Sequence, residues 1–229
     1  MSSNKTMRHI KIHKEGRLIL VSLLFILFAI NLIVYLQFPH LSIAITTIVS
    51  AGIMVFFTYF FRNPMRVVEI DDPSYILAPA DGTVVVIEPT IENEYFGDKR
   101  IQVSIFMSVF NVHANWYPIT GTVLKSVHHD GRHIGAYLPK SSQENERSTV
   151  VIETEGKTQI LVRQIAGALA RRIVTYAHPG KSCHLNEHLG FIKFGSRVDM
   201  YLPMDAEIFV KVGDKTSGNE TIIARLNES

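Results

Sequence analysis

Cysteine is nearly absent from this sequence, which has one, Cys183, among 229 residues. A single cysteine cannot form a disulfide within the chain, which agrees with a folded part kept in a reducing cytoplasm. The net charge is small too, because 23 Lys and Arg against 21 Asp and Glu leave only +2. We therefore expect no nucleic acid among the partners of this protein.

Charge is missing altogether between Leu18 and Phe61, where the sequence has no Asp, Glu, Lys or Arg. Pro39 interrupts this run near its middle and divides it into residues 18–38 and 42–61, each long enough to cross a lipid bilayer. The run is too long for a cleaved signal peptide and has no small-residue cleavage site. The sequence therefore predicts a transmembrane helical hairpin.

Basic residues flank both ends of this hairpin, whereas the connector at 37–40 has neither Lys nor Arg. They are Lys5, Arg8, Lys11, Lys14 and Arg17 before the first span, and Arg62 and Arg66 after the second. Basic flanks stay on the cytoplasmic side of a membrane. We expect a cell-membrane protein with a basic anchor over residues 1–66 and a cytoplasmic domain over 67–229.

Short β-type runs separated by turns follow the anchor. Residues 101–110 alternate as a long two-faced strand, and shorter runs at 84–87, 149–153, 159–163, 191–194, 197–202, 208–212 and 221–226 read as strands too. Only residues 165–172 read as helical. The copies of Pro-x-x-Gly-Thr-Val at 79–84 and 118–123 are turns that feed strands. We predict a mainly β domain, of the lipoyl or biotinyl hairpin-sandwich type, with one short helix.

A Gly-Ser step in Phe194-Gly195-Ser196-Arg197 is the first candidate for chemistry. Val198, Met200 and Leu202 alternate with polar residues, so a strand from Ser196 turns the serine toward the buried face. Asp81 and His113 stand out in turns elsewhere. Carboxylate, base and hydroxyl together are the minimum for nucleophilic catalysis, although each also has a plain reading as a turn or loop residue. No Gly-x-Ser-x-Gly elbow is present, which disfavours an ordinary esterase.

Two weaker candidates lie nearby. Cys183, His184 and His188 are close in sequence and invite a metal site, but no fourth ligand is evident and a loop is the better reading. We predict no metal. Arg197 would suit a substrate phosphate or carboxylate, but strand alternation points it away from Ser196, and a solvent-facing side chain is the favoured alternative.

Five ordered motifs give the soluble part a specific resemblance to the phosphatidylserine decarboxylase proenzymes, in the short form with a membrane hairpin. They are Ala78-Pro79-Ala80-Asp81-Gly82, Asn111-Val112-His113, Glu144-Asn145-Glu146-Arg147, Gln164-Ile165-Ala166-Gly167 and Phe194-Gly195-Ser196-Arg197-Val198-Asp199. The longer members carry Leu-Gly-Ser-Thr at the last site and a second histidine where this chain has Trp116. It is therefore open whether His113 alone serves the steps that two histidines share in those longer members.

The resemblance implies an enzyme that makes its cofactor from its own backbone. Ser196 would attack the Gly195 carbonyl, with His113 as base and Asp81 fixing the imidazole tautomer. The chain would then break into residues 1–195 and 196–229, which stay associated, with Ser196 converted to a pyruvoyl group. That group would support decarboxylation of phosphatidylserine, a membrane phospholipid, to phosphatidylethanolamine, with His113 as proton donor. Pairing into a homodimer is left open.

Two other functions are compatible with the sequence. A non-catalytic, membrane-anchored lipoyl-like β module would keep Gly195-Ser196 as a simple turn and stay uncut. The same chemistry on another serine-headgroup lipid, such as archaetidylserine, would differ only in the lipid tails.

Overall fold

The computed structural model describes residues 10–38, 40–131, 145–167, 172–193 and 196–227. The chain divides into two compact units, Met1–Met65 and Arg66–Ser229. Each unit is described by itself.

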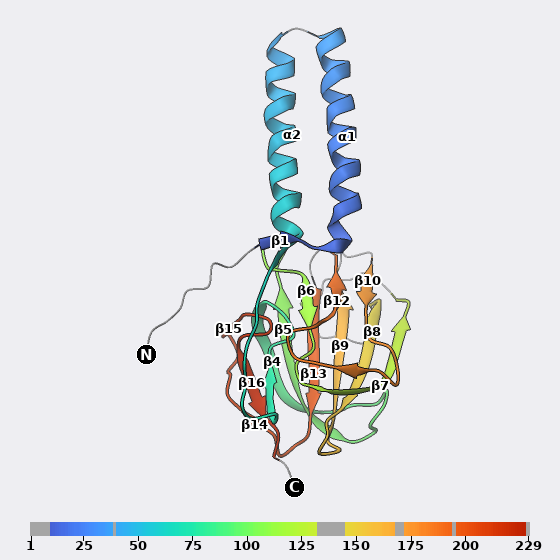
Figure 1. Ribbon diagram of the computed structural model, residues 1–229, viewed down its shortest axis with the longest axis vertical. Helices are drawn as coiled ribbons and strands as arrows, with labels where there is room; N and C mark the ends of the chain where they lie inside the picture. The colour runs from blue at the N-terminus through green and yellow to red at the C-terminus, as the bar shows by residue number, and fades with distance from the viewer. Residues whose placement is uncertain (1–9, 39, 132–144, 168–171, 194–195, 228–229) are drawn as a thin grey trace, which may run out of the picture. The chain divides into compact units, whose positions relative to one another are not determined.

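The N-terminal unit is a helical hairpin. Helix α1 covers Lys14–Gln37 and helix α2 covers His40–Phe60, and both are long and apolar enough to cross a membrane (Figure 1). Asn31 of α1 holds the two helices together, because its Nδ2 donates to Ser50 Oγ at 2.8 Å and its Oδ1 accepts from Thr47 Oγ1 at 3.0 Å. The predicted hairpin is thus present, and it is compatible with membrane association.

Two short strands close the base of this unit. Strand β1, Ile10–Ile12, pairs antiparallel with β2, Arg62–Pro64, so the segments before α1 and after α2 run side by side. Exposed large apolar side chains line both helices, including Leu18, Phe25 and Ile48. In water such a surface is unfavourable, so a lipid environment suits it.

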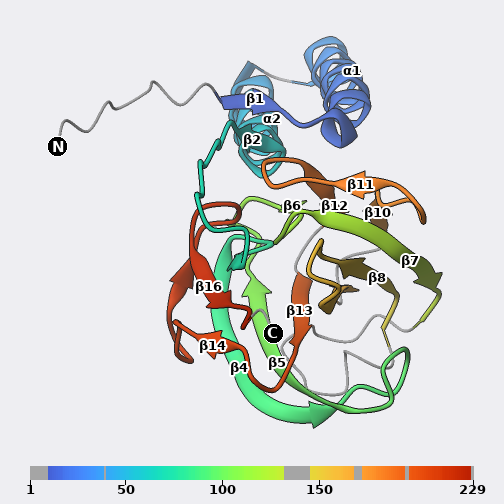
Figure 2. The same ribbon diagram turned by 60° about the horizontal axis from the view of Figure 1, so that its bottom comes forward.

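The C-terminal unit is built from strands, as predicted. Their bounds are β3 Tyr75–Leu77, β4 Gly82–Ile91, β5 Lys99–Met107, β6 Ala114–Trp116, β7 Gly121–His129, β8 Arg147–Glu153, β9 Gln159–Ala166, β10 Ile173–Thr175, β11 Ser182–Cys183, β12 His188–Ile192, β13 Ser196–Leu202, β14 Glu207–Ile208, β15 Lys215–Thr216 and β16 Ile222–Arg225. Eight of them form one sheet in the order β11-β7-β8-β9-β13-β5-β4-β15, and two three-stranded sheets, β10-β12-β6 and β14-β16-β3, complete the unit. Figure 2 shows the large sheet curling around the core.

Strand β13 lies inside the large sheet, between β9 and β5 (Figure 1). All seven of its residues are buried, so both faces of the strand are covered. Val198, Met200 and Leu202 enter the main hydrophobic core, whereas Tyr201 belongs to a smaller cluster with Val151 and Leu161. The alternation in the sequence is therefore a division between two buried environments.

Two local predictions are wrong. The segment at 165–172 was expected to be helical, and this is wrong at its start, because Ile165 and Ala166 continue β9 and pair with Arg197 and Ser196 of β13. Residues 168–171 of that segment lie outside the described residues. Ladder pairing on both sides of β9 overrides the local helical pattern. The strand expected at 208–212 is limited to Glu207–Ile208, since the chain then enters a turn where Gly213 has φ +98°. Glycine adopts this positive φ without strain, which other residues do not.

Candidate active site

Ser196 is the first residue of β13 and has no solvent exposure. Its ladder partners are Met107 of β5 and Ala166 of β9. The side chain turns to the core face, as the alternation predicted, and its Oγ donates a hydrogen bond to Met107 Sδ at 3.1 Å. Its neighbours Phe194 and Gly195 lie outside the described residues. The structure thus places a hydroxyl in a buried position beside a thioether, at the start of a central strand.

His113 lies just before β6 and is fully buried. Its Nδ1 is 3.0 Å from the carbonyl oxygen of Asn111. A carbonyl only accepts, so Nδ1 carries a proton, and in the neutral ring Nε2 then has the basic lone pair. The backbone oxygen of His113 accepts from Ile192 N at 3.2 Å, so the histidine lies beside the end of β12, four residues before Ser196. This tautomer gives a histidine whose Nε2 can accept a proton.

Asp81 stands immediately before β4, and its carboxylate is buried. Both of its oxygens accept from the guanidinium of Arg66, Oδ2 at 3.0 Å, and Oδ1 also accepts from the Gly218 amide at 2.8 Å. His113 Nδ1 lies against the carbonyl oxygen of Asn111, and the orientation of His113 by Asp81 stays a prediction.

Arg66 is a residue of this site that sequence reasoning missed. It was read only as a basic flank of the membrane hairpin, but its side chain is 6% exposed and its charge is matched by Asp81. Its guanidinium also lies over the ring of Trp116, with the central carbon 5.1 Å from the ring centroid. Nothing in the local pattern signals the pair, because the two residues are 15 positions apart in irregular sequence.

Trp116 occupies the place where longer members of the resembled family carry a second histidine. Its indole is buried and packs edge-on against His188, with ring centroids 5.2 Å apart. An indole nitrogen is only a donor, so Trp116 cannot act as a base. Cys183, one of the weaker candidates, is buried in β11, and burial raises the pKa of its thiol to about 11. Within the described residues, no group of three or more His, Cys, Asp or Glu gathers as a metal site.

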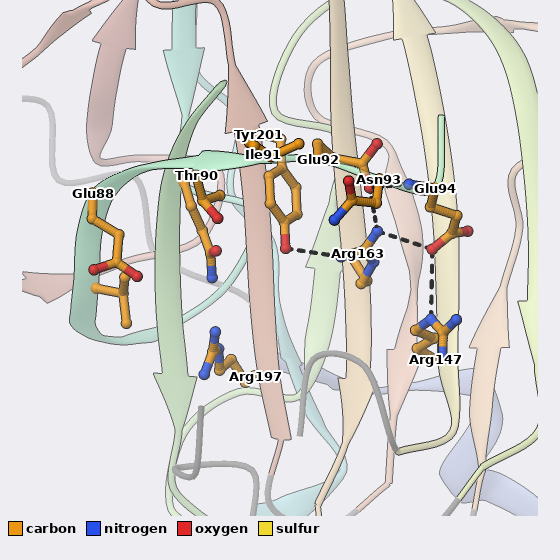
Figure 3. A pocket seen from close by; sticks show the side chains of 12 residues that line it. Glu88, Thr90, Ile91, Glu92, Asn93, Glu94, Arg147, Arg163, Arg197 and Tyr201 are labelled. Atoms are coloured by element: carbon orange, nitrogen blue, oxygen red, sulfur yellow. Dashed lines mark hydrogen bonds and ion pairs between the residues drawn. The ribbon is translucent and has the colours of Figure 1, made fainter. Parts of the chain in front are cut away.

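Arg197 lies on the face of β13 opposite Ser196, as alternation predicted. The expected solvent-facing orientation is wrong, because the side chain is only 3% exposed and its Nε donates to Asp199 Oδ1 at 2.6 Å. Its guanidinium lines a cavity of about 570 Å³ on this far face (Figure 3). Substrate binding by Arg197 next to Ser196 stays a prediction that this placement does not favour.

An ion-pair network fills part of the far face. Arg163 of β9 donates to Glu92 Oε1 at 2.7 Å, to Glu94 Oε2 at 2.9 Å and to Tyr201 Oη at 2.8 Å (Figure 3). Burial raises the pKa of Glu94, but the Arg163 charge together with the contacts of Thr149 and His129 outweighs it and leaves the pKa below its ordinary value. Glu92 behaves alike, because backbone amides and Arg163 outweigh its burial and lower its pKa. The network ties β9 to β13 and to the segment after β4.

The candidate nucleophile, Ser196, is thus a buried serine at the start of a central strand. The sequence model of the family described as phosphatidylserine decarboxylase matches residues 53–224. The chain belongs to the phosphatidylserine decarboxylase family.

Curated relatives extend the likeness over the whole chain. It is 52% identical to the phosphatidylserine decarboxylase proenzyme of Bacteroides fragilis, over 99% of this chain and 100% of that protein. The proteins of the same name from Parabacteroides distasonis and Cytophaga hutchinsonii are 51% and 49% identical, over 95% and 93% of this chain and 100% and 97% of theirs.

The Arg66–Asp81 pair generates a stability prediction. Arg66→Met leaves a buried carboxylate without its counter-charge, and we expect a loss of about 3 kcal/mol in the free energy of unfolding. Adding Asp81→Asn should recover part of this loss, because the buried charge is then gone. Urea unfolding of the full-length protein in detergent measures both. Strictly additive effects of the two substitutions would contradict a direct pair.

The far-face network gives a matched comparison of two ion pairs. Arg163→Met should cost about 3 kcal/mol, because Glu92 is left charged and buried. Arg225→Met removes an ion pair with Glu207 whose side chains are 42% and 51% exposed, and it should cost less than about 1 kcal/mol. Equal losses in urea unfolding would show that the network contributes no more than a surface pair.

The pH dependence of stability follows from the same carboxylates. The pKa values of Glu92 and Glu94 are lowered in the folded protein from an ordinary value of 4.5. Their stabilisation is therefore complete above pH 4.5 and is lost as the pH falls through the lower, folded values. Glu92→Gln should flatten this acid limb when unfolding is measured at a series of pH values.

Proposed function

We propose that this protein decarboxylates phosphatidylserine to phosphatidylethanolamine, using a pyruvoyl group that the chain makes from Ser196. The observation that carries the proposal is the position of Ser196, fully buried at the start of a central strand in a chain of this family. A serine in an ordinary surface turn would have its hydroxyl in water, and this one donates to a thioether.

Self-processing begins at the Gly195–Ser196 peptide bond. Ser196 Oγ attacks the Gly195 carbonyl carbon and gives its proton to a base, for which Nε2 of His113 is suited by its tautomer. The carbon–nitrogen bond breaks and an ester takes its place. A base then removes the Cα proton of Ser196 and the Cβ–O bond breaks, which releases Gly195 as a carboxylate and leaves a dehydroalanine. This enamine takes up a proton at Cβ and becomes an imine, and water hydrolyses the imine to the ketone with loss of ammonia.

The surroundings of Ser196 fit a pyruvoyl group. This group has the same three carbons as serine, so it needs no more room than the side chain already has. Ser196 Oγ donates to the sulfur of Met107, a weak acceptor, so loss of this hydrogen bond costs little. When formed, the group supplies an electron sink for decarboxylation of a bound amine.

Several strands hold the C-terminal piece in place after cleavage. Residues 196–229 contribute β13, which pairs along its length with both β5 and β9. The piece also contributes β15, which pairs with β4, and β16, which pairs with β3. Because each of these partners belongs to residues 1–195, separation would break four ladders, and the two pieces should stay together.

The apolar helices support a membrane location for the reaction. A phospholipid substrate stays in the bilayer, and an enzyme anchored by α1 and α2 meets it there. The basic residues before α1 and after α2 favour a cytoplasmic position for both ends of the hairpin. We propose that the β unit acts on the cytoplasmic leaflet.

Activity on labelled lipid tests the proposal. The full-length protein in mixed micelles should release labelled carbon dioxide from phosphatidylserine labelled at the headgroup carboxyl, and Ser196→Ala should release none. Ser104→Ala is the matched control, because Ser104 is a buried serine of the neighbouring strand β5, where it accepts from Gln102 at 2.9 Å. It should retain activity.

Two results would contradict the proposed function. Folded wild-type protein without carbon dioxide release would favour the non-catalytic β module. Release from Ser196→Ala at the wild-type rate would remove the pyruvoyl group from the mechanism. Faster release from archaetidylserine than from phosphatidylserine would keep the chemistry and change the lipid.

A further inference from the structure

Two buried donors converge on the sulfur of Met107. Ser196 Oγ lies 3.1 Å from Met107 Sδ, and Asn115 Nδ2 lies 3.7 Å from the same atom. All three residues have no solvent exposure. A thioether is a weak acceptor, and buried donors normally find oxygen, since poor pairing in the core costs stability. The arrangement therefore points to a purpose other than stability.

The other end of the Asn115 carboxamide is fixed by a hydrogen-bond chain. Its Oδ1 accepts from Gln164 Nε2 at 2.7 Å, and Gln164 Oε1 lies 2.8 Å from the hydroxyl of Thr175. That hydroxyl is 2.6 Å from Ser148 Oγ. The reverse orientation of Asn115 would place an amide oxygen against a sulfur that has no proton to donate. The chain thus directs the amino group of Asn115 at Met107.

The backbone leaves room for this chain. Gly190 of β12 stands opposite Asn115 in the ladder between β12 and β6. A Cβ at Gly190 would lie against the backbone oxygen of Val174 and 2.7 Å from Gln164 Nε2, closer than real Cβ atoms come. Glycine at this position therefore lets β10 and β12 pair closely and leaves the carboxamide of Gln164 its place beside Asn115. Three strands, β6, β9 and β12, therefore cooperate to place one carboxamide near Ser196.

We propose that Asn115, held by Gln164, is a positioning residue for self-cleavage, and the proposal rests on the function proposed above. Its N–H fixes the thioether of Met107, an otherwise adaptable side chain, and the sulfur in turn holds the hydroxyl of Ser196 in one rotamer. The hydroxyl oxygen is lost when the pyruvoyl group forms. Asn115 and Met107 therefore act mainly on the rate of processing, and less on decarboxylation.

The test is a comparison of cleavage rates after pulse labelling of newly made, full-length protein. Met107→Leu keeps volume and removes the acceptor, and Asn115→Ala removes the donor. Each should slow the appearance of the 34-residue C-terminal piece by about tenfold, the size expected for one hydrogen bond. The double variant should be no slower than the slower single one, because both act through one sulfur.

Gln164→Leu and Gln102→Leu form the matched pair. Both replace a buried glutamine of the large sheet, but Gln102 bonds to Ser104 and Asp199 on the far face and has no part in the chain to Ser196. Gln164→Leu should slow cleavage, and Gln102→Leu should cleave at the wild-type rate. Thermal unfolding of all variants separates slow cleavage from poor folding.

Three outcomes would overturn the inference. The first is cleavage at the wild-type rate in Met107→Leu, the volume-conserving variant that is the safest to fold. The second is equal slowing by the two glutamine variants. The third is a loss of turnover per cleaved molecule as large as the loss in cleavage rate. An uncut wild type contradicts the proposed function itself, whereas a cut wild type with unaffected variants contradicts only the role of Asn115.

Discussion

The site depends on the hydrogen-bonded position of β13 between β5 and β9. An interior strand has both edges paired, so its first residue is fixed by two neighbours at once. Ser196 is that residue, and the regular pairing that follows it sets the direction of every side chain on the strand. The same ladders would retain residues 196–229 after a break before Ser196. The pairing of β13 therefore fixes the position of Ser196, and it would also keep the two pieces together after cleavage.

Polar groups on the two faces of β13 have different partners. On the far face, Arg197 and Arg163 meet carboxylates at short distances, and the charges are matched. On the core face, Ser196 has a thioether beside it. Strong pairing is typical of a structural network, whereas a weakly held hydroxyl costs little to remove. This contrast is why we place the chemistry at Ser196 and assign the arginines of the far face to stability.

Sequence patterns predicted the parts of the protein that depend on neighbours along the chain. The charge-free run predicted the helices, and the alternation of Val198 and Met200 predicted the inward Ser196. Contacts between distant segments had no such signal. Asp81 meets the amide of Gly218 across 137 positions, and Gln164 meets Asn115 across 49. The helical start expected at Ile165 is wrong for the same reason, because β13 and β8 pair with Ile165 from elsewhere in the sequence.

The mass of the purified protein under denaturing conditions tests the central claim most directly. The account predicts two fragments, residues 1–195 and a C-terminal piece that begins at position 196 with a ketone in place of its amine. Both should elute together before denaturation, and Ser196→Ala should give one uncut chain. A single intact chain from folded wild-type protein would contradict the account, and so would a C-terminal piece that keeps an ordinary serine amine.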